Sequence, residues 1–407
     1  IRNSKTAETI SAQRLWSCKL LKKKPKAFKT EGDFFLLILV LAISVFGIVM
    51  IYSASYYHSI SKHGIPHYFL KNDLLYKGIG WISFILLANF NYHRLAKYSW
   101  PILLVGIGLL VFIYAVPSMV ITINDARRWI NFFDLFTIMP GEIIKTCLIL
   151  FMSWFLTSRK DCVRDPKSIA FLIVLTAIIF LLIAKQPNVS TAGSVVVLSL
   201  GMLFFAGLPK LVIAGSFLLA LLGGGAYIFA KGGYLISRIN AFLDPWEDPL
   251  GQGYQVIQSL LALGSGGVLG LGLGNSIQKM LYLPYSENDF IAAIIGEELG
   301  YIGLLLLLMA YMLLIWRCFR AAVRARDSYG MLLASGVGLH IAIQVILNIA
   351  VVSASFFPTG VVLPLVSMGG NATMLFLAEL AIVYNVSRYP CEQSAEPAED
   401  AAAGEGV

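Results

Sequence analysis

Ten long apolar runs constrain this chain more than any other feature of its sequence. A bilayer core about 30 Å thick takes about 20 helical residues, and each run is close to that length. With 58% hydrophobic and 13% charged residues in 407, the chain is far more apolar than a soluble domain. We therefore expect an all-α polytopic membrane protein of about ten transmembrane helices, with a long outer loop between the seventh and eighth. The runs lie near 34–52, 74–90, 100–117, 142–157, 169–184, 192–208, 211–230, 289–316, 330–352 and 361–386.

Basic residues are distributed unevenly over the loops. If the N-terminus is inside, the inner segments hold 21 of the 31 Lys and Arg residues and the outer loops hold 8. Basic residues are retained on the cytoplasmic side, so we expect both termini to be cytoplasmic and segment 231–288 to be outside. A basic segment (1–32) and an acidic tail (391–407) lack apolar periodicity and are expected to be mostly disordered, which leaves a membrane domain at 33–390.

The net charge of +8 does not indicate nucleic-acid binding. The positive charge is concentrated in the basic N-terminal segment and the inner loops, where it would face anionic membrane lipid. Of the five cysteines, none falls in a predicted outer loop, so no disulfide is expected there.

Asp289 stands where the polar 231–288 segment meets the eighth apolar run. At about 100° per residue a helix would align it with small residues, and such a stripe lets membrane helices approach closely. The acid should then point into protein or a cavity, where a carboxylate is a functional candidate. Ser286, three residues earlier, fits a helix cap equally well. The small residues are Ala292, Ala293, Gly296, Gly300 and Gly303.

Two further acids, Glu297 and Glu298, follow in the same run. An unpaired charge there would cost a few kcal/mol, so both must be neutral, paired or hydrated. A structural pair with a basic or amide group on a neighbouring helix is one interpretation, and a proton path is the other.

The second outer loop carries Arg127 and Arg128 beside Trp129. Two arginines at a membrane surface can grip a diphosphate through forked hydrogen bonds, or they can be interfacial anchors. Glu142 and Lys145, three residues apart in the next run, share a helix face and are able to pair with each other.

Other clusters indicate no cofactor site. The glycines between Gly264 and Gly274 match neither a dinucleotide fingerprint nor a phosphate-binding loop; they suit a re-entrant or lipid-facing loop whose backbone packs closely. His58, His63 and His67 match no metal signature and are expected to be surface polar residues.

Four motifs give the chain a resemblance to the SEDS family (shape, elongation, division and sporulation), which includes FtsW, RodA and SpoVE. The resemblance covers about 34–390, and GEELG with DPWEDPLG resembles the division and sporulation branch. The motifs are ARRWI at 126–130, FLDPWEDPLGQGYQVIQSLLALGSGG at 242–267, Asp289-Phe290 followed by GEELG, and PTGVVLPLVSMGGN at 358–371.

The resemblance implies a GT-C-like fold and polymerisation of lipid II at the outer face of the bacterial cytoplasmic membrane. Asp289 would be the general base. Binding of substrate or of undecaprenyl diphosphate would fall to Arg127, Arg128, Lys145, Glu142, Lys279 and Gln258, and support to Glu297, Glu298, Ser367 and Asn188. The implied partners are a class B penicillin-binding protein, a transpeptidase, together with divisome or sporulation wall-synthesis proteins. No metal ligand and no certain cofactor follow, with Mg or Mn left open.

The chain departs from the family pattern at several positions. Glu287 and Asn288 replace His-Thr before Asp289, and a carboxylate so near would raise the pKa of that aspartate. Asn188 replaces the aspartate of Gln-Pro-Asp, Met139 replaces a glutamine, and Met368 and Asn371 alter Ser-Tyr-Gly-Gly-Ser. These departures motivate one alternative to the polymerase, a non-catalytic scaffold that activates another wall synthase. The other alternative is a lipid II flippase, which would need ionisable groups along a path through the membrane; the candidates are Glu297, Glu298, Glu379 and Lys145.

Overall fold

The computed structural model describes residues 31–123, 126–132, 136–158, 165–231, 239–240, 242–251 and 253–390. The acidic tail and nearly all of the basic N-terminal segment lie outside this part. The described helices are α2 (Phe34–His63), α3 (Tyr68–Asn89), α4 (His93–Ala115), α5 (Pro140–Ser158), α6 (Pro166–Ala184), α7 (Val189–Phe205), α8 (Lys210–Lys231), α10 (Tyr254–Gly266), α11 (Ile291–Arg324), α12 (Ser328–Val352) and α13 (Asn371–Ser387).

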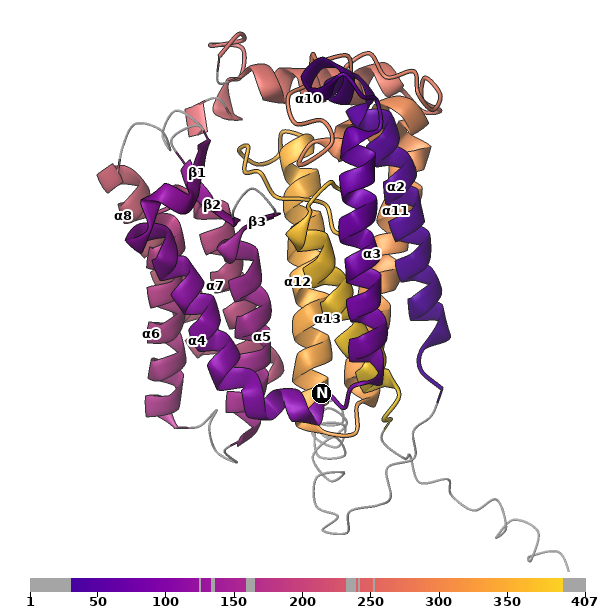
Figure 1. Ribbon diagram of the computed structural model, residues 1–407. Helices are drawn as coiled ribbons and strands as arrows, with labels where there is room; N and C mark the ends of the chain where they lie inside the picture. Colours follow the sequence, from indigo (N-terminus) through magenta and orange to yellow (C-terminus); the bar gives the residue numbers. More distant parts are fainter. Residues whose placement is uncertain are drawn as a thin grey trace, which may run out of the picture.

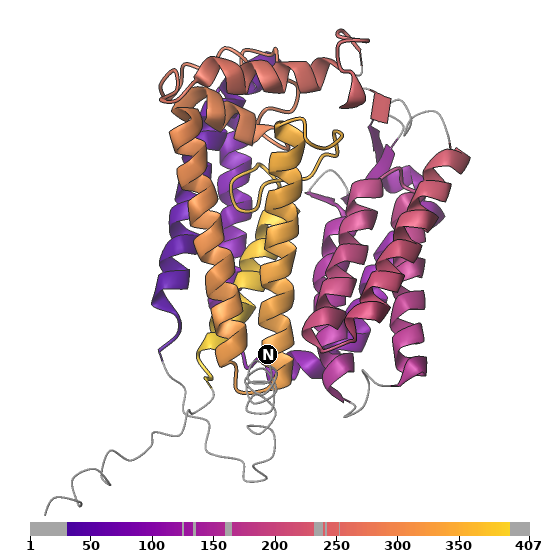
Figure 2. The same ribbon diagram turned by 180° about the vertical axis from the view of Figure 1, so that it is seen from behind.

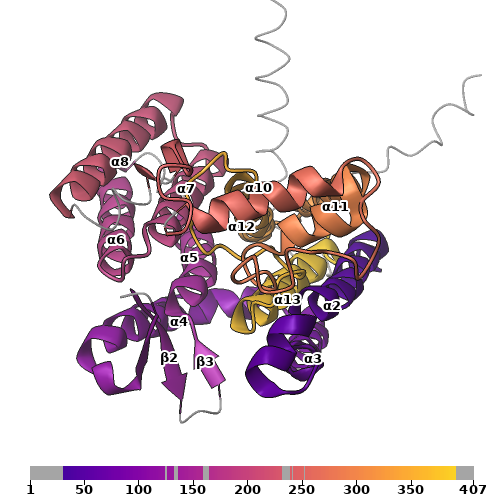
Figure 3. The same ribbon diagram turned by 90° about the horizontal axis from the view of Figure 1, so that it is seen from above.

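The long helices form two groups that stand side by side. Figure 1 shows α4 to α8 in one group and α2, α3, α11, α12 and α13 in the other, and Figure 2 shows the same division from behind. Helices α5 and α12 join the groups by direct packing. Helix α10 lies across one end of the bundle, over α12 and α11 in the view from above (Figure 3). We call this the outer end, following the predicted orientation.

All ten predicted apolar runs coincide with helices of the described chain, because a membrane-spanning backbone must satisfy its own hydrogen bonds. Six of these helices are long and apolar enough to cross a membrane by length and composition, namely α2, α4, α5, α6, α11 and α12. Helices α7 and α13 and the Lys210–Gly225 part of α8 are shorter apolar helices, and α3 belongs to neither set. The last run was predicted at 361–386, but α13 begins only at Asn371. Pro364 and the positive φ angles of Gly360, Leu365 and Gly370 keep the preceding segment non-helical.

The second outer loop folds into a small antiparallel sheet that the all-α prediction did not include. After a 3-10 turn, η1 (Pro117–Met119), come β1 (Val120–Ile123), β2 (Ala126–Phe132) and β3 (Phe136–Ile138), in the order β1-β2-β3. Ile130 at the centre of β2 pairs with both neighbouring strands and is fully buried. The sheet contacts α4 and α5 and lies near the outer end (Figure 1).

Helix α11 is broken at Gly300, whose φ of 69° is left-handed. The carbonyls of Glu297 and Glu298 accept hydrogen bonds from Leu271 N (3.0 Å) and Gly272 N (2.9 Å) in the glycine-rich loop instead of continuing the helix. In return Tyr301 N donates to Gly267 O at 2.9 Å. The predicted close backbone packing of these glycines is confirmed.

The predicted stripe of small residues beneath Asp289 is wrong as a single helical face. Asp289 lies in a turn before α11 starts at Ile291, so it does not share the helix geometry on which the alignment depended. The break at Gly300 also rotates Gly303 away from the register of the first two turns.

Candidate active site

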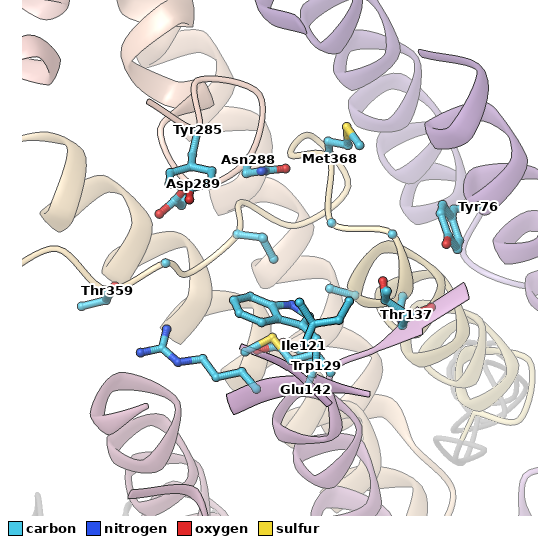
Figure 4. A pocket seen from close by; sticks show the side chains of 18 of the residues that line it. Tyr76, Ile121, Trp129, Thr137, Glu142, Tyr285, Asn288, Asp289, Thr359 and Met368 are labelled. Atoms are coloured by element: carbon cyan, nitrogen blue, oxygen red, sulfur yellow. The ribbon is translucent and has the colours of Figure 1, made fainter. Parts of the chain in front are cut away.

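A cavity of about 500 Å³ lies towards the outer end, between the two helix groups. Its wall is assembled from segments far apart in sequence, and Figure 4 shows Asp289 and Thr359 on one side with Tyr76 and Thr137 on the other. Polar or charged lining residues include Asn72, Tyr76, Arg128, Thr137, Glu142, Gln255, Asn288, Asp289, Thr359 and Asn371.

Asp289 is half-buried on the cavity wall. Its backbone carbonyl accepts a hydrogen bond of 2.8 Å from Nδ2 of Asn348 on α12. Helix α11 has Phe290 as its N-cap and no side-chain cap bond, while Ser286 Oγ donates to Ala54 O at 3.4 Å. The helix-cap interpretation of Ser286 and Asp289 is therefore wrong, and the prediction that Asp289 faces a cavity is confirmed.

The two neighbouring arginines of β2 have different environments. The pairing of β2 with β1 skips Arg128, because Ile121 pairs with Trp129 and Thr122 pairs with Arg127. A bulge of this kind redirects a side chain, and Arg128 is 8% exposed and lines the cavity, whereas Arg127 is exposed and does not line it. Arg128 donates a hydrogen bond to the carbonyl of Pro187, which precedes α7. The strand thus delivers one guanidinium to the cavity and leaves the other outside.

Asp289 and Arg128 border the same residue, Gly360. A Cβ atom on Gly360 would lie 3.7 Å from Asp289 Oδ2 and 4.0 Å from Arg128 Nη1. Beside it, Thr359 is 3% exposed and its Oγ1 has no hydrogen-bond partner among the described residues. A carboxylate, a guanidinium and a hydroxyl therefore meet around a glycine that has no side chain to fill the space.

Glu142 also lines the cavity, but its carboxylate is bonded to two side chains that lie outside the cavity lining. Lys145 Nζ lies 2.7 Å from Glu142 Oε2, and Gln344 Nε2 donates to the same oxygen at 3.1 Å. The predicted pairing of Glu142 with Lys145 is confirmed. Lys145 is 1% exposed and does not line the cavity.

Glu297 and Glu298 are fully buried in structural interactions. Glu298 Oε1 is 2.7 Å from Lys279 Nζ, and Ser53 Oγ donates to the same carboxylate at 2.6 Å. Glu297 accepts from Ser276 Oγ at 2.5 Å and from the Ile277 amide at 3.0 Å. The structural-pair interpretation is confirmed, although the basic partner, Lys279, comes from the outer loop and not from a neighbouring helix, while α2 contributes Ser53.

Four other predicted site residues lie outside the cavity lining. Lys279 is 3% exposed in its pair with Glu298, and Ser367 accepts from Leu363 N at 2.8 Å. Asn188 caps α7 by accepting from Thr191 N at 3.4 Å, and Gln258 is half-buried on α10. Their predicted roles toward substrate stay predictions.

The prediction that the three histidines are surface polar residues is wrong for His58. His58 Nδ1 lies 2.8 Å from Glu287 Oε1, so His58 is not simply a surface polar residue. Glu287 is 2% exposed and does not line the cavity, whereas Asn288 and Asp289 do. The turn thus directs this carboxylate to α2 and the next two residues to the cavity. Among the described residues, no group of three His, Cys, Asp or Glu side chains could hold a metal ion.

Sequence reasoning missed two lining residues with specific chemistry, Trp129 and Thr359. Both residues lie inside motifs that carried the family resemblance, so membership of these motifs was the signal that could have identified them. The complete arrangement places a carboxylate that can accept a proton close to a guanidinium that can bind an anion. This combination suits a transfer reaction with an anionic leaving group.

Comparison with known proteins places these observations in a family. A family model described as FTSW_RODA_SPOVE, cell cycle protein, matches residues 34–391. The chain is 38% identical to stage V sporulation protein E of Bacillus subtilis (strain 168) over 366 residues, which is 89% of this chain and 98% of the relative. It is 36% identical to a probable peptidoglycan glycosyltransferase FtsW of Geobacter sp. (strain M18) over 362 residues, covering 88% and 98%.

A solved structure has the same fold. Its description reads "Structural coordination of polymerization and crosslinking by a peptidoglycan synthase complex". Its matching chain superposes with a TM-score of 0.71 at 29% identity, over 88% of this chain and 98% of that one.

Proposed function

The chain belongs to the FtsW, RodA and SpoVE family of cell cycle proteins, the SEDS family that its motifs resemble, and on that premise we propose that it polymerises lipid II into glycan strands during cell division or sporulation. The observation that carries the proposal is the placement of Asp289 and Arg128 next to Gly360 in one cavity.

Asp289 acts as the general base. It takes the proton from the 4-hydroxyl of the acceptor N-acetylglucosamine while that oxygen attacks the anomeric carbon of the donor sugar. The bond from that carbon to the lipid diphosphate breaks, and the configuration inverts. A positioned base contributes about 10²- to 10⁴-fold to such a step.

Arg128 stabilises the diphosphate as it leaves. A guanidinium forms forked, charge-assisted hydrogen bonds with phosphate oxygens, and a preorganised cation is most effective where charge develops. The buried Thr359 hydroxyl adds a donor on the same wall. Glu142, held by Lys145 and Gln344, shapes the wall and does not act as the base.

The polymerase functions at the outer face of the cytoplasmic membrane with both termini inside, as the distribution of Lys and Arg supports. Its partner is a class B penicillin-binding protein. The likeness to a chain of a peptidoglycan synthase complex supports such a partner.

The flippase alternative receives less support. It calls for ionisable groups along a path, but its four candidates are buried and bonded to protein groups: Lys145 to Glu142, Glu379 to His340, Glu298 to Lys279, and Glu297 to Ser276. The scaffold alternative rested on the departures around Asn188 and Glu287, and neither of these side chains lines the cavity. Four other departures, Met139, Asn288, Met368 and Asn371, do line it.

The test is glycan formation from lipid II by the purified protein with its transpeptidase partner, comparing wild type with Asp289→Ala and Asp289→Asn. We expect polymer from wild type and none from either variant, with partner binding retained in all three. Normal polymerisation by Asp289→Ala would remove Asp289 as the base. Absence of polymer from wild type, with binding intact, would favour the scaffold or the flippase.

A further inference from the structure

Helix α12 presents three polar side chains at one-turn intervals on a single buried face. His340, Gln344 and Asn348 are 2%, 1% and 0% exposed. His340 Nδ1 lies 2.9 Å from Glu379 Oε2 on α13, and Gln344 donates to Glu142 on α5. Residues four apart lie on the same side of a helix, so α12 uses this face to hold several elements at once.

Asn348, at the outer end of this face, joins two walls of the cavity. Its Nδ2 donates to the carbonyl of Asp289 at 2.8 Å and to the carbonyl of Val361 at 2.7 Å. Because both neighbours are acceptors, the amide must turn its NH₂ group and not its oxygen toward them. One side chain therefore uses both of its donors on two backbone segments that are otherwise far apart in sequence.

Both segments carry the chemistry of the cavity. The peptide that Asn348 holds on one side belongs to Asp289 itself. On the other side Val361 follows Thr359 and Gly360, the residues that face Asp289 and Arg128. Fixing the two carbonyls to one rigid helix fixes how far the carboxylate stands from the Thr359–Gly360 wall.

We propose that Asn348 is a positioning residue, which clamps the Asp289 turn and the 358–362 segment in the geometry that the reaction requires. The inference rests on the proposed function, since it assigns Asn348 to the same site. Asn348 touches no reacting atom; it acts through the backbone of Asp289. A misplacement of about 1 Å caused by a residue away from the chemistry can cost about 10²-fold in rate.

The variants Asn348→Asp and Asn348→Leu test the clamp. The aspartate keeps the size of the side chain but loses the NH₂ donors, and the leucine removes all hydrogen bonding. The matched control is Asn275→Asp: Asn275 is exposed, lies outside the cavity lining and donates to one backbone carbonyl, Leu271 O, at 3.0 Å. The Asn275→Asp variant loses the same kind of hydrogen bond, but this residue is not part of either cavity wall.

Two measurements are made on purified protein with its partner. The first is kcat and KM for lipid II: we expect kcat to fall by about 100-fold in both Asn348 variants with KM changed by less than about threefold, because positioning acts in the transition state. The second is amide hydrogen exchange, which should rise in peptides covering 285–291 and 358–363 and stay unchanged around Glu142. The control should match wild type in both.

A wild-type kcat in a folded Asn348→Leu protein would overturn the inference, as would unchanged exchange in both segments. A general rise in exchange over α12 and α5 would also overturn it, since that would show a purely structural role. If wild type makes no polymer, the proposed function fails, and the exchange measurement alone then decides the clamp.

Discussion

Gly300 of α11 and Gly270 of the outer loop touch backbone to backbone. A Cβ atom on Gly300 would lie 2.4 Å from the amide nitrogen of Gly270, and a Cβ atom on Gly270 would lie 2.2 Å from the carbonyl oxygen of Glu298. Both residues have positive φ angles, 69° and 81°. Only glycine combines this backbone conformation with so close an approach. Because neither residue has a side chain, the main chains of the loop and the helix come close enough to form hydrogen bonds with each other at this point.

Gly300→Ala should therefore destabilise the protein. The left-handed conformation alone costs about 1–3 kcal/mol for a residue with a side chain, and the clash with Gly270 adds to it. We expect a lower Tm in detergent, followed by intrinsic fluorescence or by loss of the monodisperse peak in size-exclusion chromatography.

The control for this prediction is Gly108→Ala. Gly108 lies inside α4, and a Cβ atom there meets no heavy atom within 4 Å. Alanine is favoured over glycine within helices by about 1 kcal/mol, so this variant should match or exceed the wild-type Tm. Equal Tm values for the two variants would show that the junction at Gly300 tolerates a side chain.

The helices were predictable and the junction was not. Each apolar run formed a helix because that requirement is local: a stretch in a membrane must bond its own backbone. The break at Gly300 depends on partners about thirty residues earlier in the chain, such as Gly270, which no periodicity records. The sheet of β1, β2 and β3 was missed for a different reason, because its strands are short and lie between two long helices.

The site was predictable where residue type decides and not where environment decides. Asp289, Arg128 and Glu142 were predicted and all line the cavity. Arg127 was given the same role as Arg128, because the β-bulge that separates their environments was not predicted. Asn348 was not predicted, and its spacing of four from Gln344 in an apolar run was the signal that could have identified it.

Arg127 and Arg128 offer a direct test of this difference in environment. Arg128→Met should lower kcat/KM for lipid II by about 10²-fold or more, the scale seen when one donor to a developing oxyanion is removed. Arg127→Met should stay within about threefold of wild type, because an exposed charge outside the cavity interacts weakly. The assay is the lipid II polymerisation used for Asp289.

Arg128→Lys refines the result, since lysine keeps the charge and loses the planar fork. We expect the kcat/KM of this variant for lipid II to lie between the values of Arg128→Met and wild type. Equal losses in Arg127→Met and Arg128→Met would instead indicate that both arginines bind the diphosphate, as the family resemblance implied.

Lys279 and Glu298 allow binding and structural roles to be separated. Their side chains are 3% and 0% exposed and 2.7 Å apart. Removing one member of a buried ion pair costs about 3–5 kcal/mol, whereas replacing both by apolar residues of similar size is often neutral or stabilising. We therefore expect a marked loss of Tm in Lys279→Met and in Glu298→Leu, and recovery in the double variant.

Polymerisation then decides what the lysine does. Because the Lys279 ammonium already lies against Glu298 and Ser53 and does not line the cavity, the stable double variant should make polymer at a rate near that of wild type. A double variant that regains its Tm but makes no polymer would contradict this expectation. Lys279 would then leave Glu298 during turnover to meet the diphosphate, and the role implied by the family resemblance would be correct.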